Sequence, residues 1–210
     1  MIKHNPAWMI LRMATGFAIG LSLLFWLPAT WPGVVAPAVT LLVDASPYLE
    51  NTRTRVESDH VVTEGMIRVN MTLQNGEKLP PVPGTWKKHT DQSATLLMVT
   101  LAVWMAPTAS IRRRLIALPV SLLIAALASG LSLITELHVV ALHTMGYEWL
   151  ATAPLANTQE NLRVFERMEQ WYDRFVWIKA FLDGGGRLFL GIIAGLAGYA
   201  WPTRAADPGK

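Results

Sequence analysis

The chain has no cysteine in its 210 residues, so it can form no disulfide and offers no thiolate to a metal, an iron–sulfur cluster or a covalent reaction. Charged residues are scarce at 16%, against roughly a quarter in ordinary soluble domains. Hydrophobic residues make up 52% of the chain, and its mean hydropathy is +0.32. This composition argues against a disordered chain and indicates an integral membrane protein.

The motifs of familiar enzymes are absent too. The sequence has no G-x-S-x-G, H-E-x-x-H or Walker A pattern, and no lysine follows the Gly184–Gly186 run in the register of a phosphate loop. The net charge of +3 comes from basic residues at the ends of apolar runs, which form no stripe that could follow a nucleic-acid backbone. We therefore expect a protein that is not an enzyme, holds no cofactor or metal, and binds no nucleic acid.

Four apolar runs dominate the sequence. A membrane-spanning helix needs about 20 apolar residues, and we predict one span in each of Trp8–Leu27, Ser93–Ser110, Leu115–His143 and Trp177–Trp201. The first run is longer than the core of a signal peptide and no small-residue cleavage site follows it, so we expect a retained anchor. The predicted fold class is a membrane all-α protein with four transmembrane helices, a small extracytoplasmic β-hairpin and an extracytoplasmic amphipathic helix.

Basic residues set the predicted orientation. They lie at the start of the chain, between the second and third spans, and at the end of the chain. If the chain crosses the membrane four times, these three places are all on the same side. The positive-inside rule makes this side the cytoplasm, so we predict a multi-pass protein of the bacterial inner membrane with both termini cytoplasmic. Contact with anionic lipid is an added role for the central arginines. The basic residues are Lys3, Arg12, Arg204, Lys210 and the topology anchor Arg112, Arg113 and Arg114.

The spans define an anchor, an outer segment, a transmembrane hairpin, a second outer segment and a last span with a short tail, over residues 1–27, 28–92, 93–143, 144–176 and 177–210. In the first outer segment, Gly33–Val43 is apolar but too short to span, which indicates an interfacial or re-entrant helix. Arg55–Thr63 and Met66–Leu73 have strand character on either side of the turn signal Gly65, and residues 77–92 indicate an extended loop.

The second outer segment has the pattern of an amphipathic helix. Thr158 can cap its start, and apolar residues then recur at spacings of three and four. Such a stripe is more often a packing face than a ligand site. We predict that it lies on the membrane surface or contacts a partner subunit through Leu162, Phe165, Met168 and Tyr172.

Three charged residues follow at spacings of four and form one line on a helix: Lys179, Asp183 and Arg187. Gly184–Gly186 lies between them and permits a kink. We favour a hinge with an internal ion pair. Contact of these charges with a partner, and a proton path through them, remain alternatives.

Small residues four positions apart let helix backbones approach closely. Such pairs occur in the first and the last predicted spans, and we predict that they pack helices within the chain or between chains. The residues are Gly16, Gly20, Gly191, Ala194, Gly195 and Gly198.

Glu136, His138 and His143 are the polar residues at the outer end of the third predicted span. Glu136 and His143 are seven apart and share a helix face, whereas His138 points elsewhere. Spacings of two and five do not bring two histidines and a carboxylate together on a metal. We expect interfacial polar residues, and keep a metal site, a proton relay and a partner contact as alternatives.

In the order of its spans and outer segments, the chain resembles the exosortase-associated small membrane proteins of bacteria. The likeness consists of one anchor, the Pro-containing stretch 33–43, the β-like segment Val56–Leu73, and three further spans that end at Trp201. The resemblance implies an accessory role in envelope protein sorting. Exosortases resemble cysteine peptidases, so a chain without cysteine is implied to be a companion, and no catalytic residue carries over.

The sequence therefore predicts a non-catalytic accessory, assembly or scaffolding subunit of a larger inner-membrane complex, with other integral membrane subunits and lipids as partners. One alternative is a small transporter or channel subunit that uses Asp183 and Arg187. A second is a membrane enzyme with Glu136 and His143 at the outer face.

Overall fold

The computed structural model describes residues 6–26, 30–58, 60–89, 91–107 and 109–200. The predicted anchors at Lys3, Arg204 and Lys210, and the tryptophan at position 201, lie outside these residues. Helices dominate, and a three-stranded sheet interrupts them between the second and third helix. The α-helices are α1 (Pro6–Trp26), α2 (Thr30–Asp44), α3 (Asp91–Met105), α4 (Ile111–His143), α5 (Gln159–Phe181) and α6 (Arg187–Ala200), with π-helical turns at η1 (Thr144–Trp149) and η2 (Leu182–Gly186).

Three helical stretches are long and apolar enough to cross a membrane: α1, α4 and the continuous stretch Gln159–Ala200. Three of the four predicted spans correspond to these stretches, whereas the predicted second span falls on a shorter apolar helix. It overlaps α3, which has 15 residues and is about 22 Å long at 1.5 Å per residue. α3 ends two residues before Pro107, because the residue preceding a proline avoids helical geometry.

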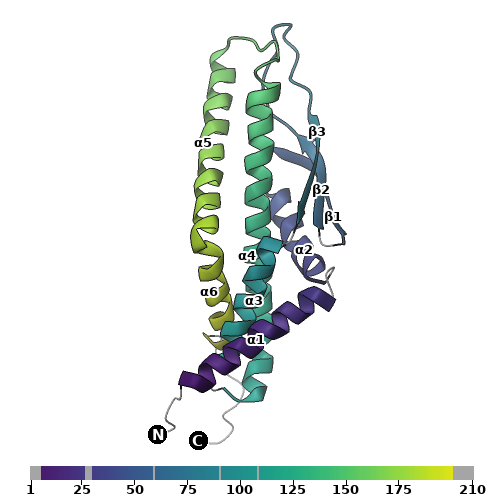
Figure 1. Ribbon diagram of the computed structural model, residues 1–210. Helices are drawn as coiled ribbons and strands as arrows, with labels where there is room; N and C mark the ends of the chain where they lie inside the picture. The colour runs from purple at the N-terminus through teal and green to yellow at the C-terminus, as the bar shows by residue number, and fades with distance from the viewer. Residues whose placement is uncertain (1–5, 27–29, 59, 90, 108, 201–210) are drawn as a thin grey trace, which may run out of the picture.

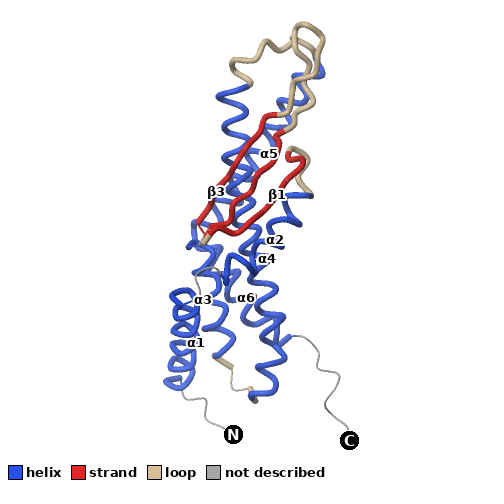
Figure 2. Tube along the Cα trace, turned by 90° about the vertical axis from the view of Figure 1, so that its right-hand side faces the viewer, coloured by secondary structure: helices blue, strands red, loops and turns tan. Residues whose placement is uncertain are grey.

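The helices form two halves along the length of α4 (Figure 1). In the first, which we call the bundle half, α3 contacts α1, α4 and α6, and α6 also contacts α4. In the second, the sheet half, α2, α5 and the sheet surround the later part of α4 (Figures 1 and 2). α4 has 33 residues, about 50 Å as a helix, and so extends through both halves.

The sheet is antiparallel with strand order β1-β2-β3, formed by β1 (Leu49–Glu57), β2 (His60–Ile67) and β3 (Val82–His89). The predicted two-stranded hairpin around Gly65 is wrong: β1 ends at Glu57 and β2 begins at His60, so the first connection falls at residues 58–59. Gly65 lies inside β2, opposite Gly84. The predicted loop over 77–92 contains β3, an edge strand in which the missing N–H of Pro83 is tolerated.

A close approach by β1 explains why residue 65 is a glycine. β1 has a register shift between Glu50 and Arg53, and Asn51 there has a φ of 52°. A Cβ on Gly65 would lie 2.9 Å from Thr52 Cγ2. The glycine therefore makes room for the bulge rather than forming a turn.

α2 begins three residues before the predicted stretch 33–43 and ends one residue after it. Its residues Val35, Val39 and Val43 are fully buried, and the helix packs on α4. A Cβ on Gly130 of α4 would lie 3.0 Å from Ala38 Cβ, so the two helices approach closely there. α2 is thus part of the core that joins the sheet to α4.

A band of exposed apolar side chains marks the part of the protein suited to lipid. On α4 it runs from Ile111 to Leu131, about 30 Å of helix, which equals the thickness of a bilayer's hydrocarbon core. On α6 it includes Leu188 and Leu196. Beyond this band α5 exposes mainly charged residues between Gln159 and Arg174, so the band indicates that lipid contacts the bundle half.

Candidate functional site

A network of charged side chains lies where the two halves meet. Glu136 of α4 is at its centre, with a side chain only 5% exposed. Its Oε1 accepts a hydrogen bond from Arg187 Nη2 of α6 at 3.1 Å, and its Oε2 forms an ion pair with Lys88 Nζ of β3. One buried carboxylate therefore joins a helix of the bundle half to a strand of the sheet half.

Arg187 extends the network along its own helix. Its Nη1 donates to Asp183 Oδ1 at 2.7 Å, and its Nε donates to Ser132 Oγ of α4 at 3.1 Å. Lys179 Nζ donates to Asp183 Oδ2 at 2.5 Å. The network thus contains three cations and two carboxylates, and it carries one net positive charge.

The break between α5 and α6 lies within this network, between Asp183 and Arg187. Gly185 has a φ of 113° within η2, a left-handed conformation that favours glycine, and the helix is kinked there. The kink and the ion pairs among Lys179, Asp183 and Arg187, both predicted from spacing, are confirmed. Spacing did not predict that Arg187 also binds Glu136, because the two residues are 51 positions apart.

His138 joins three elements on the other side of α4. Its Nδ1 lies 2.9 Å from the carbonyl oxygen of Ile134, and its Nε2 lies 2.6 Å from Ser46 Oγ. Because a carbonyl oxygen only accepts, Nδ1 carries the proton, and in the neutral ring Nε2 accepts from the serine hydroxyl. The ring also stacks on Phe175 of α5, with centroids 4.3 Å apart.

The three polar residues at the end of α4 therefore have separate surroundings. Glu136 binds Arg187 and Lys88, His138 binds Ser46, and the ring of His143 lies 6.4 Å from that of Tyr172, centroid to centroid. Among the residues that the structure describes, no group of three histidine, aspartate or glutamate side chains could hold a metal ion. Glu136 and His143 thus have different partners, in the charge network and on α5 respectively.

Asn161 forms a second polar joint that the sequence did not suggest. Its Oδ1 accepts from the Thr72 backbone N–H at 2.9 Å, and its Nδ2 donates to the carbonyl oxygens of Thr72 and Ala156 at 2.8 and 2.7 Å. Thr158 Oγ1 accepts from the Asn161 N–H, which confirms the predicted cap. An asparagine in the first turn of a helix was the only local signal, and it does not identify a partner 89 positions away.

The amphipathic stripe on α5 divides between the core and the surface. Met168 is buried inside the chain, and Tyr172 is half-buried. Leu162 and Phe165 are 56% and 43% exposed. These two apolar side chains lie on the part of α5 beyond the lipid-facing band and are accessible to another molecule.

The predicted packing residues lie at helix contacts within the chain. A Cβ on Gly16 of α1 would lie 2.3 Å from the Leu101 carbonyl oxygen of α3, and one on Gly20 would lie 3.1 Å from Met98 Cα. A Cβ on Gly198 of α6 would lie 2.2 Å from the Ala117 carbonyl oxygen of α4. Gly191 and Gly195 approach α3 in the same way, and Ala194 is fully buried.

The predicted inner turn at residues 111–114 is the first turn of α4, and its arginines are tied to neighbouring segments. Arg114 Nη2 donates to the Pro107 carbonyl oxygen at 2.8 Å, and Arg113 Nη2 donates to that of Tyr199 at 3.4 Å. Trp104 Nε1 donates to the Arg114 carbonyl oxygen at 3.0 Å. Arg112 is exposed. The turn thus joins the ends of α3, α4 and α6.

Comparison of the chain with protein-family models, curated proteins and solved structures finds no significant match. The resemblance to exosortase-associated proteins therefore stays a prediction. The assignment of function depends on the residues and contacts described above.

Proposed function

We propose that this protein is a non-catalytic subunit of a bacterial inner-membrane complex, in which it scaffolds or assembles other integral membrane proteins. In this proposal the shorter helix α3 is the fourth membrane crossing, so both termini lie in the cytoplasm and the sheet and most of α5 lie outside. An accessory role in envelope protein sorting, as the resemblance implies, is the most specific form of the proposal.

The observation that carries the proposal is the charge network. A transporter would need Asp183 and Arg187 available to its cargo, and an enzyme would need Glu136 available to its substrate. Instead, Glu136 and Arg187 bind each other across two helices, and each has a further partner in Lys88 or Asp183. Charges satisfied in this way favour a structural role over transport or catalysis.

The exposed surface of α5 supports the proposal that the protein binds a partner. Leu162 and Phe165 present apolar area at a level where the neighbouring surface is charged, so water covers them unless another protein does. Burial of apolar area of this kind on association is favourable by roughly 25 cal/mol per Å². Contact through Leu162, Phe165 and Tyr172 places the partner beside α5.

Purification of the tagged full-length chain in mild detergent tests this proposal, with mass spectrometry of the proteins that accompany it and of their stoichiometry. We expect a partner in fixed ratio. Phe165→Asp should release that partner because it puts a charge in the contact. Gln170→Asp, at an exposed position five residues further on and so on another face of the same helix, is the matched control and should retain the partner.

A purified monomer or homo-oligomer without any fixed-ratio companion would contradict the proposal. Equal retention of the partner by wild type and Phe165→Asp would contradict the assignment of the contact to α5. In either case, a flux assay of Asp183→Asn in vesicles distinguishes a transporter, which loses flux, from a subunit.

A further inference from the structure

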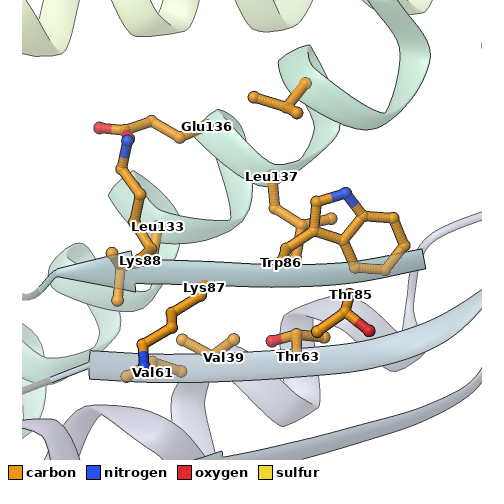
Figure 3. A pocket seen from close by; sticks show the side chains of 11 residues that line it. Val39, Val61, Thr63, Thr85, Trp86, Lys87, Lys88, Leu133, Glu136 and Leu137 are labelled. Carbon is orange, nitrogen blue, oxygen red and sulfur yellow. The ribbon is translucent and has the colours of Figure 1, made fainter. Parts of the chain in front are cut away.

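A pocket of about 280 Å³ lies between α4 and the sheet. This is just below the range of about 300–1,000 Å³ for small-molecule sites. Figure 3 shows its walls, with α4 on one side and β2 and β3 on the other. The apolar wall consists of Val39, Val61, Trp86, Leu133, Leu137 and Val140.

Charged side chains lie at one end of this pocket. Lys88 and Glu136 meet there, and Trp86 lies toward the other end (Figure 3). The Lys88 side chain remains 46% exposed. An ammonium group has three donors, so Lys88 can bind a further anion while it pairs with Glu136. Arg187 shares Glu136 with Lys88, and the whole network of Lys88, Lys179, Arg187, Glu136 and Asp183 carries one net positive charge.

The pocket lies at the level of a lipid headgroup. The exposed apolar band of α4 ends at Leu131, and the pocket follows it from Leu133 to Val140. With α4 rising 1.5 Å per residue, these residues lie about 33–44 Å from Ile111. A band of about 30 Å of hydrocarbon therefore ends beside the pocket. Val140 at its rim is 52% exposed, which leaves the pocket open to the interface.

We propose that this pocket binds one anionic phospholipid, with its phosphate at Lys88 and one acyl chain against the apolar wall. The apolar wall selects an acyl chain, the free donors of Lys88 select a phosphate, and the position beside the lipid-facing band supplies both from the bilayer. Lys87 is the neighbouring cation on β3, but successive side chains of a strand point to opposite faces, and its ammonium pairs with Glu57 of β1 rather than with Glu136.

The test uses the full-length protein in vesicles that contain phosphatidylglycerol with a diazirine on its acyl chain, and parallel vesicles with the same label on phosphatidylcholine. After illumination, mass spectrometry locates the labelled residues. We expect phosphatidylglycerol to label residues 133–140 of α4 and the facing strands, and phosphatidylcholine to label them several times less. The apolar band should be labelled equally by both lipids.

Two pairs of variants test the wall and the charge. Val140→Trp fills the rim of the pocket and should lower labelling there about tenfold, the equivalent of ~1.4 kcal/mol. Leu127→Trp on the lipid-facing band is its control and should leave pocket labelling unchanged. Lys88→Gln should lower pocket labelling by phosphatidylglycerol about fivefold, since one lysine near anionic lipid contributes on the order of 1 kcal/mol. Lys87→Gln is its matched control.

Equal pocket labelling by the two lipids, or no loss with Val140→Trp, would overturn the proposal. So would a photo-crosslinker at position 140 that captures a protein segment in place of lipid, because the pocket would then be a protein contact. The far-ultraviolet circular dichroism of each variant, compared with wild type, shows whether the fold is retained. If Val140→Trp fails to fold, Val140→Phe provides a smaller obstruction with the same expected direction.

Discussion

The bundle half and the sheet half are held together by different means. In the bundle half, Gly16, Gly195 and Gly198 bring helix backbones together, with no room for a Cβ at these contacts. In the sheet half, Glu136 and Asn161 join segments that are far apart in the sequence. The bundle half carries the lipid-facing band, whereas the sheet half lies beyond it.

The difference follows from the solvent around each half. Lipid chains are as apolar as the side chains of a helix, so burial between helices gains little there and close packing of small residues takes its place. At the interface and beyond it, polar side chains can be used, and a few long-range pairs fix how the sheet and α5 sit on α4. The charge network lies at the border, where one carboxylate serves both halves.

The largest effect should come from Glu136→Gln. Removal of this charge leaves Arg187 and Lys88 without their common partner, and loss of one member of a buried pair costs about 3–5 kcal/mol. We expect the free energy of unfolding, from titration with sodium dodecyl sulfate in mixed micelles, to fall by about 3 kcal/mol. Asp183→Asn, at a side chain 39% exposed, should cost less than about 1 kcal/mol. Equal losses for both variants would contradict the central position of Glu136.

Gly198→Ala should rank next. Its Cβ would lie 2.2 Å from the Ala117 carbonyl oxygen, so the backbones of α4 and α6 must separate. Overpacking of this kind costs about 1–3 kcal/mol, and we expect a loss of about 2 kcal/mol in the same titration. Gly184→Ala is the matched control, because nothing lies within 4 Å of a Cβ there. Unchanged stability of Gly198→Ala would mean that the two helices do not pack closely.

Asn161→Ala tests the polar joint at the far end of the sheet half. The variant loses three side-chain hydrogen bonds and leaves the Thr72 N–H without its acceptor, so we expect a loss of about 1–2 kcal/mol. Amide hydrogen exchange at residues 71–73 should accelerate, while that of α6 stays unchanged. Gln159→Ala, exposed two residues earlier, should leave both regions unchanged.

The smallest effect is a pH dependence in the exposed face of the sheet. Arg55, and after it Lys87, lowers the pKa of the Glu57 carboxyl below its ordinary value. A carboxyl with a lowered pKa adds stability above its unfolded pKa, near 4.3, and that stability is lost as the pH falls through the folded pKa. Glu57→Gln should therefore reduce the acid sensitivity of the sheet, as followed by hydrogen exchange between pH 5 and pH 3. A profile identical to wild type would show that the pairing has no effect on stability.

Local patterns predicted the helices of the chain well. α1 and α4 lie close to the predicted runs, because a long apolar run has few other structures available in a membrane. Thr158 caps α5, and Gly185 marks the kink before α6. Each of these features depends on residues that lie close together in the sequence or in one continuous run.

The sheet and the charge network required information that local patterns do not contain. Glycine is typical of turns, so Gly65 indicated a turn. Its actual role is to make room for the bulge in β1, which is a different strand. Glu136 meets Lys88 and Arg187 only after α4, β3 and α6 have packed. Opposite charges at the ends of apolar runs were the one available signal that Glu136 and Arg187 could pair.

A double-mutant cycle on Glu136 and Arg187 tests most directly whether the charges at the junction of the two halves are structural. The free energies of unfolding of wild type, Glu136→Gln, Arg187→Gln and the double variant give the coupling between the two side chains. We predict a coupling of about 2 kcal/mol, within the range for residues in one network. A coupling below about 0.5 kcal/mol, the error of additivity for independent sites, would contradict a structural role and make these charges candidates for transport or catalysis.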